Sequence, residues 1–264
     1  MGEVTRYPRG TFCWVDLGTT ELDAARAFYR DLLGWTIEEV KSPDPGPYLI
    51  ARVDGKDVVG LHAHSEGTAH GWDSYVAVDD LDATLARIGA LGGDTGEGPH
   101  DIPGSGRTAA VTDPSGARVC LWQAQGFQGA RLVNETGTWS WNDLSTRDPA
   151  AAEAFYTGLF GWAFRQVAPV YWSISRGEDL LIGGMRTVEE DPPGPPPNWM
   201  PYFVMADLDA AGGQVGELGG AVVVPPLEVP AGRFLVAADP AGATFGLLEM
   251  GPEGAARGVD ALGG

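Results

Sequence analysis

The chain repeats itself at an offset of 127 residues, and this repeat limits its possible folds more than any other feature. The segment GTFCWVDLGTT, which begins at Gly10, returns as GTWSWNDLSTR beginning at Gly137. The same offset carries Trp14 to Trp141 and Asp16 to Asp143. Solenoid units repeat every ~20–50 residues, so a period this long predicts two copies of one complete domain.

The repeat also sets the expected domain boundaries. Matching positions run from the strand-like segment at Gly10 as far as the Asp-Pro turns at Asp113 and Asp239. We expect a first domain at residues 8–124, a linker at 125–136, a second domain at 137–250 and a flexible tail at 251–264. The proportions of 44% hydrophobic and 20% charged residues are those of folded globular domains.

Each copy has strand and helix patterns in the order β-α-β-β-β, followed by the same order again. TFCWVDL alternates as a strand does, and residues 21–33 place Ala24, Phe28 and Leu32 on one helical stripe before Gly34, a typical helix end. An Asp-Gly pair at 54–55 separates two short strands in the manner of a hairpin. The sequence therefore predicts an α+β protein with four βαβββ units.

The charge balance excludes some classes of partner. With 17 Lys and Arg against 36 Asp and Glu, the net charge is −19, which disfavours nucleic acid and anionic membranes. No apolar run reaches the ~18–20 residues of a membrane span, and the N-terminus has no signal-peptide pattern. Only two cysteines, Cys13 and Cys120, are present, so we expect a cytoplasmic protein without disulfides.

Three repeated motifs resemble those of the vicinal oxygen chelate superfamily, which includes glyoxalase I, extradiol dioxygenases and bleomycin-resistance proteins. They are AFYRDLLGW and AFYTGLFGW, then VAVDDLDA and VMADLDA, and finally TDPSGARVCLW and ADPAGATFGLL. The resemblance covers residues 8–250 and is strongest to tandem-domain actinobacterial proteins of the glyoxalase-like or hydroxylase-like type. It implies two tandem domains, each made of two βαβββ modules that form a cup-shaped mixed sheet.

The resemblance also implies where metal-binding relatives keep their ligands. These positions lie on the first, fifth and last strands of a domain, and here they hold Trp14, Asp73 and Cys120 in the first domain and Trp141, Met200 and Gly246 in the second. Trp, Met and Gly do not bind a hard divalent ion. We therefore expect no metal and no cofactor, with an adventitious zinc site at Asp73 and Cys120 as the alternative.

The repeated Trp-x-Asp pairs are the main candidates for a functional site. Side chains two positions apart on a strand share a face, so each Trp and Asp should line the cup together. The predicted ligand-binding residues are Trp14, Tyr75, Cys120, Trp141, Trp172 and Tyr202, and the predicted general bases are Asp16 and Asp143. The structural alternative is that Trp14 fills the cup while Asp16 caps the backbone or pairs with an arginine such as Arg107.

All four histidines lie in the first copy, at positions 62, 64, 70 and 100. His62 and His64 form an H-x-H pair that could bind a metal or act as acid and base. We expect instead that they are solvated surface residues. Trp72 and Trp199, at the starts of corresponding strands, are candidates for packing between the domains.

Together these features predict a metal-free protein that binds a planar aromatic or polyketide-type small molecule in aromatic-lined cups. Its expected setting is natural-product resistance or biosynthesis, and its expected state is a monomer or homodimer. A metal-independent hydroxylase-like or cyclase-like enzyme is the first alternative. A metal-dependent lyase or dioxygenase and an interaction protein are further alternatives.

Overall fold

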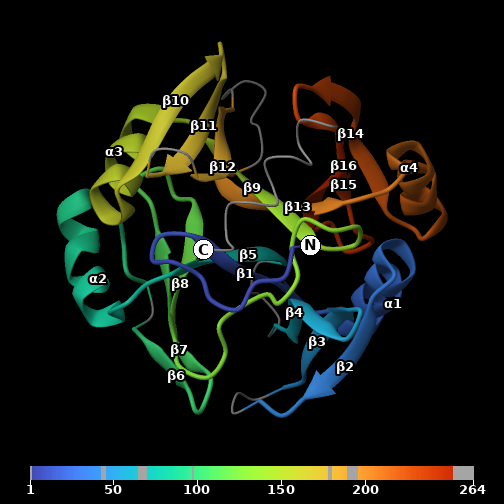
Figure 1. Cartoon of the computed structure of the whole chain (residues 1–264), viewed down its shortest axis with the longest axis horizontal. Coiled ribbons are helices and arrows are strands. Elements are labelled where there is room, and N and C mark those ends of the chain that lie inside the picture. Colours follow the sequence, from blue (N-terminus) through green and yellow to red (C-terminus); the bar gives the residue numbers. More distant parts are fainter. Residues whose placement is uncertain are drawn as a thin grey trace.

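Two eight-stranded mixed sheets, one from each half of the chain, form the protein (Figure 1). The computed structural model describes residues 2–42, 46–64, 70–96, 98–177, 180–188 and 196–251. The expected tail at 251–264 falls almost wholly outside them. The strand orders are β2-β3-β4-β1-β5-β8-β7-β6 and β10-β11-β12-β9-β13-β16-β15-β14. The predicted α+β fold of two tandem domains is confirmed.

The first half contains eight strands, two α-helices and one short 3-10 helix among its described residues. They are β1 (Phe12–Thr19), α1 (Leu22–Leu33), β2 (Thr36–Val40), β3 (Tyr48–Val53), β4 (Lys56–Ala63), β5 (Gly71–Ala77), α2 (Leu81–Ile88), η1 (Gly89–Leu91), β6 (His100–Ile102), β7 (Gly106–Thr112) and β8 (Arg118–Ala124). Strand β1 pairs in parallel with β4 and antiparallel with β5, so the two βαβββ modules join at the centre of the sheet.

The second half repeats this order. Its elements are β9 (Trp139–Thr146), α3 (Pro149–Phe160), β10 (Trp162–Ala168), β11 (Tyr171–Arg176), β12 (Leu180–Thr187), β13 (Asn198–Val204), α4 (Leu208–Glu217), β14 (Ala221–Val229), β15 (Gly232–Ala238) and β16 (Thr244–Met250). Strand β9 takes the place of β1, between β12 and β13.

Local sequence signals explain where the helices begin and end. Gly34 and Gly161 adopt left-handed conformations, with φ of 72° and 75°, and end α1 and α3. The Asp80 side chain accepts a hydrogen bond from the backbone N–H of Ala83 and caps α2, and Asp207 caps α4 in the same way. These capping residues belong to the repeated motifs of the sequence: the glycines lie near the ends of the AFY motifs, and the aspartates lie in VAVDDLDA and VMADLDA.

The helices and one face of each sheet build a core that is shared by the two domains. Helix α1 contacts α4, and α2 contacts α3, on opposite sides of the molecule (Figure 1). Phe28 and Tyr29 of α1 pack against Phe245 of β16, with ring centroids 6.1 and 5.4 Å apart. Most of the buried hydrophobic residues of both halves form one continuous cluster. The other face of each sheet is therefore the inner face, which the helices do not cover.

Several repeated aromatic residues serve this interface in matched pairs. The Trp35 indole donates to the backbone carbonyl of Gly137 at 2.6 Å, and the Trp162 indole donates to that of Gly10 at 2.7 Å. Trp72 lies 5.1 Å from Phe203 of the other domain, measured between ring centroids. Trp199 likewise lies 4.9 Å from Phe12. The interface thus has approximate two-fold symmetry, and it accounts for the repeated Gly-Trp and strand-start Trp.

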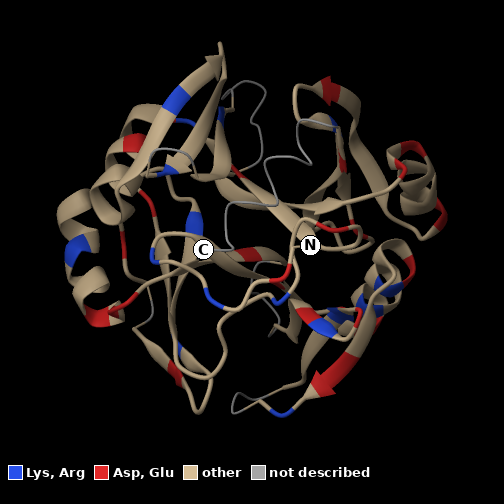
Figure 2. Cartoon of the chain, in the orientation of Figure 1, with Lys and Arg blue, Asp and Glu red and all other residues tan. Residues whose placement is uncertain are grey.

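The charged side chains are unevenly distributed. Figure 2 shows acidic residues on the helices and on the outer strand β2, where Glu38 and Glu39 lie. Strand β14, at the edge of the second sheet, has the sequence AVVVPPLEV and carries only one charge. No helix in the described part of the chain is long and apolar enough to cross a membrane.

Candidate functional site

A hydrogen-bonded cluster centred on Asp16 lies on the inner face of the first sheet. The phenols of Tyr75, on β5, and Tyr48, on β3, donate to Asp16 Oδ2 at 3.0 and 3.3 Å. The Trp14 indole donates to the Tyr48 hydroxyl at 3.1 Å. Three strands therefore contribute to one cluster around a carboxylate that is only 3% exposed. We call the inner face around it the first cup.

The same cluster recurs around Asp143 in the second domain. The indole of Trp141 and the phenol of Tyr171 both donate to Asp143 Oδ1 at 2.8 Å. The Tyr202 phenol on β13 also interacts with this carboxylate. Tyr171 on β11 and Tyr202 are the counterparts of Tyr48 and Tyr75. We call this inner face the second cup.

A glycine on the neighbouring strand makes room for each cluster. A Cβ atom at Gly60 of β4 would lie 2.8 Å from the Asp16 Cβ and would overlap the Tyr48 hydroxyl. A Cβ atom at Gly184 of β12 would overlap both the Tyr171 hydroxyl and Asp143. Glycine is therefore required by close approach at both positions.

The two carboxylates differ in how far their oxygens are satisfied. Asp16 Oδ1 is buried and has no hydrogen-bond partner, while His62 Nε2 lies 3.7 Å from it. Burial alone would lower the pKa of His62, but the Asp16 and Asp73 charges outweigh it and raise that pKa above its ordinary value. Buried unpaired oxygens are rare in folded proteins, so this carboxylate–imidazole pair is the feature of the first cup that most needs an explanation.

This placement corrects two expectations about the first cup. His62 is not a solvated surface residue, because its side chain is only 25% exposed and faces Asp16. Its ring also lies 4.6 Å from that of His64, and burial together with His62 lowers the pKa of His64. Arg107 does not pair with Asp16, because its guanidinium binds Asp82 and Asp101.

In the part of the chain that the structure describes, no imidazole lies beside the carboxylate of the second cup. In the first domain His62 lies beside Gly18 across the paired strands. The corresponding pair in the second domain is Arg186 and Ser145, and the Arg186 guanidinium donates to the Ser145 hydroxyl at 2.9 Å. Burial raises the pKa of Asp143 despite the hydrogen bonds that it accepts. The two carboxylates thus differ: Asp143 accepts hydrogen bonds from Trp141 and Tyr171, whereas Asp16 keeps one buried oxygen without a hydrogen-bond partner.

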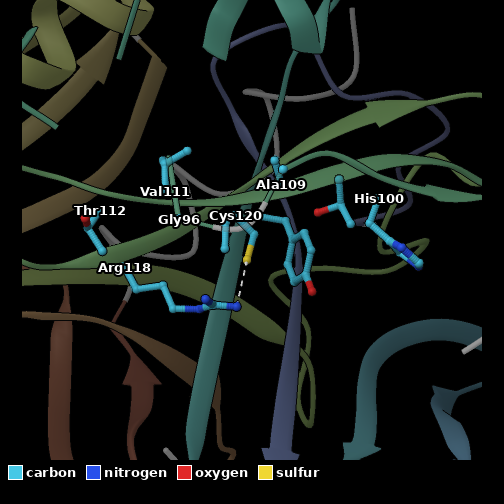
Figure 3. A pocket seen from close by; sticks show the side chains of 11 residues that line it. Gly96, His100, Ala109, Val111, Thr112, Arg118 and Cys120 are labelled. Carbon is cyan, nitrogen blue, oxygen red and sulfur yellow. Dashed lines mark hydrogen bonds between the residues drawn. The ribbon is translucent and has the colours of Figure 1, made fainter. Parts of the chain in front are cut away.

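A cavity of about 240 Å³ adjoins the first cup between β5, β7 and β8 (Figure 3). The residues that line it include Tyr75, Cys120, Arg118 and His100. Burial raises the pKa of the Cys120 thiol well above its ordinary value, so the thiol stays protonated. This volume is slightly below the ~300–1,000 Å³ of typical ligand pockets. It fits a small ring or the end of a larger one.

The positions at which metal-binding relatives keep their ligands do not suit a metal ion here. Asp73 is held by Arg118, whose guanidinium donates to both carboxylate oxygens at 2.8 and 3.2 Å. In the second cup, the Tyr202 ring fills the space into which a side chain at Gly246 would project. No group of three or more His, Cys, Asp or Glu among the described residues is placed to hold a metal. The donor set, a Trp with an Arg-paired Asp and a protonated thiol, therefore does not fit.

The second cup is the more apolar of the two. Met200, Tyr202 and Val236 form a buried cluster that is separate from the main core, and Trp141, Val224, Phe234 and Leu248 pack on it. Trp172, a predicted ligand-binding residue, is not part of it. Trp172 pairs across the strands with the fully buried Met185 and packs on the main core, so it lies on the opposite face from Tyr171.

The predicted residues Trp14, Asp16, Tyr75 and Cys120 thus meet in the first cup, and Trp141, Asp143 and Tyr202 meet in the second. Sequence reasoning missed Tyr48 and Tyr171. The sequence does hold a signal for them, because a tyrosine opens the third strand of each copy. The offset between these two tyrosines, however, is 123 rather than 127 residues. A gap of four residues in the repeat hid the match.

Each half of the chain forms a cup from two βαβββ modules, with the candidate site on its inner face. This arrangement defines a class of protein. Residues 11–121 match the Glyoxalase/Bleomycin resistance protein/Dioxygenase superfamily, and residues 129–248 match the Glyoxalase-like domain. The chain belongs to this superfamily.

Full-length relatives support this assignment. CFP32 of Mycobacterium tuberculosis (strain CDC 1551 / Oshkosh), which carries a provisional glyoxylase name, is 37% identical over 96% of this chain and 100% of its own. The anthracycline biosynthesis protein DauV of Streptomyces sp. (strain C5) is 33% identical over 94% of this chain and 96% of its own. The anthracycline biosynthesis protein DnrV of Streptomyces peucetius is equally similar, with the same coverage.

Solved structures show the same fold at lower identity. The Mn(II)-bound glyoxalase from Novosphingobium aromaticivorans superposes with a TM-score of 0.64 at 19% identity, over 94% of this chain and 83% of that one. The 2,3-dioxygenase LapB from Pseudomonas sp. KL28 has the same TM-score at 17% identity, over 95% and 94%. At these identities the similarity concerns the fold.

Proposed function

We propose that this protein binds a planar aromatic, polyketide-type small molecule on its inner sheet faces, without a metal, in natural-product biosynthesis. The observation that carries the proposal is the duplicated cluster of Trp, Asp and two Tyr. The Trp of each cluster stands at the position of the first metal ligand that the resemblance implies, and the cluster offers aromatic rings there in place of a ligand. Such faces gain about 0.5–1.5 kcal/mol from an aromatic partner beyond area burial.

The relatives favour biosynthesis over resistance. DauV and DnrV are named for anthracycline biosynthesis, and anthracyclines are planar, polycyclic aromatic polyketides. A ligand of that class presents flat rings for stacking and hydroxyl groups for hydrogen bonds. The tryptophans and tyrosines of the cups suit the rings, and the polar groups of the first cup suit the hydroxyl groups.

Fluorescence titration tests this function. The intact protein, purified and checked for bound metals by elemental analysis, is titrated with 1,4-dihydroxyanthraquinone while tryptophan emission is recorded. Saturable quenching at micromolar concentrations, in protein that contains no stoichiometric transition metal, is the expected result. A lack of saturable binding, or binding that requires a stoichiometric metal, would refute the proposal.

A second candidate is an enzyme that transfers a proton in the first cup, with Asp16 and His62 as its acid–base pair. The specific observation is the buried, unpaired Asp16 Oδ1 at 3.7 Å from the imidazole. If a bound compound is converted, Asp16→Asn should abolish conversion while leaving its affinity unchanged. Asp143→Asn is the matched control, since the Asp143 cluster contains no imidazole. Equal losses from both substitutions would contradict this assignment.

A further inference from the structure

The exposed large apolar side chains of the described residues all lie in the second domain. They are Val167, Val170, Val222, Val223, Leu227 and Val229, on β10, the β10–β11 turn and β14. The corresponding edges of the first sheet differ: β2 carries Glu38 and Glu39, and β6 is only three residues long. The two domains share one fold, so the exposed apolar residues are a specific property of the second one.

Part of this apolar surface continues the second cup. Val224 of β14 pairs with Val236 of β15, and Leu227 pairs with Phe234. Cross-strand partners share a face of the sheet, and Val236 and Phe234 belong to the apolar cluster of the second cup. Leu227, which is 47% exposed, therefore extends that cluster to the edge of the sheet.

The polar atoms within the second cup are already satisfied. The Trp141 indole and the Tyr171 phenol both donate to Asp143, so neither needs a hydrogen-bond partner from a ligand. What remains available are the half-buried side chains packed on the buried cluster and the exposed Leu227. Burying them gains roughly 25 cal/mol for each Å² of apolar surface removed from water, which favours an uncharged, flat ring system.

The edge itself is a poor template for another protein strand. Pro225 and Pro226 interrupt β14, and proline has no backbone N–H to donate. An added strand, from a second copy or from another protein, would therefore lack regular hydrogen bonds at the centre of this edge. The apolar surface suits a small molecule better than β-strand addition.

We propose that the second cup, extended by Leu227 of β14, is the site that holds the uncharged fused-ring part of the ligand. The first cup, with Asp16, His62 and the Asp73–Arg118 pair, is the polar site. This division rests on the proposed function. It adds that the two copies of the domain have separate tasks, and it names the ring-binding one.

The test compares two substitutions on the same strand. Leu227→Glu places a carboxylate on the inner face. Val222→Glu is the matched control, because Val222 is 41% exposed but pairs with Ala237 of the main core and so lies on the opposite face. Binding of 1,4-dihydroxyanthraquinone to the full chain is measured by fluorescence, circular dichroism confirms folding, and Leu227→Asn is a milder second variant.

Leu227→Glu should raise the dissociation constant about tenfold, because it removes apolar contact and places a charge where it loses water. Leu227→Asn should raise the dissociation constant less, and Val222→Glu should leave it unchanged. Equal effects of the substitutions at 227 and 222, or no effect of either, would overturn the assignment of the ring site while leaving the proposed function standing. Loss of a dimer in sedimentation, with unchanged dye binding, would overturn it in favour of a self-association surface. Failure of the unsubstituted protein to bind the dye would refute the proposed function itself.

Discussion

Gly246→Ala tests whether the Tyr202 ring takes the place of a metal ligand in the second cup. Gly246 stands on β16, opposite Tyr202 of the parallel strand β13. A Cβ atom at Gly246 would overlap three carbons along one edge of the Tyr202 ring, Cγ, Cδ1 and Cε1, of which Cγ is the atom that joins the ring to Cβ. The ring cannot avoid it by moving its tip, so either the ring or the strand must shift.

The cost follows from the packing around this ring. Tyr202 is only 5% exposed and belongs to the buried cluster of the second cup. Overpacking such a site costs about 1–3 kcal/mol. At ~2–4 °C per kcal/mol for a chain of this size, the Tm of Gly246→Ala should fall by roughly 2–12 °C. Urea unfolding followed by circular dichroism and differential scanning calorimetry measure this loss.

The same substitution in a Tyr202→Ala background identifies the cause. Removing the ring costs stability itself, about 3–5 kcal/mol for a buried aromatic, but it also removes the overlap. Gly246→Ala should then cost less than about 0.5 kcal/mol, so the two substitutions should be strongly non-additive. Equal costs in both backgrounds, or no cost in the unsubstituted protein, would show that the Tyr202 ring does not occupy this space.

Three further predictions follow from the interface and the two carboxylates. Trp35→Phe and Trp162→Phe should each lower the free energy of unfolding by about 1–3 kcal/mol, because each leaves a buried carbonyl without a hydrogen bond. Urea unfolding measures both losses, and unequal losses would argue against the two-fold interface. The folded-state pKa of Asp143 is raised, so the stability from this carboxyl is complete below its unfolded pKa and is lost as pH rises through the folded one. Urea unfolding across a pH series should therefore show Asp143→Asn gaining stability relative to the unsubstituted protein as pH rises above about 4, and a constant difference would contradict the raised pKa. Asp16→Asn should lower the pKa of His62, measured by NMR titration of the imidazole, because it removes the nearest negative charge, and an unchanged pKa would show that the two groups are not coupled.

The repeat predicted the fold, and strand alternation predicted which residues share a face. Trp141 and Asp143 are two residues apart on a strand, and their side chains are hydrogen-bonded. Alternation also explains why Trp172 does not line the cup. It neighbours Tyr171, so a shift of one residue moves the side chain to the core side of the sheet.

The rest of the site depends on strand order, which periodicity does not show. His62 meets Asp16 because β4 pairs in parallel with β1 in a register that aligns Gly60 with Asp16. Nothing local to LHAHSEG reveals that register. Tyr48 lies 32 residues from Asp16 in sequence, and the four-residue gap in the repeat concealed its counterpart. Contacts between distant segments decided the composition of the cluster.

The comparison of the two copies separates structural from functional roles within this site. What both domains share, the cluster of Trp, Tyr and Tyr around an Asp, joins three strands on each inner face and so gives the repeated Trp-x-Asp a structural role beside the aromatic surface that it offers. What differs needs another explanation. His62 stands where the second copy has Arg186, Cys120 where it has Gly246, and the Asp73–Arg118 pair has no counterpart at Met200. Two copies with one fold and one cluster have no structural need for these differences. The polar groups confined to the first cup, and the exposed apolar edge confined to the second, are therefore where the specific activity of this protein should be sought.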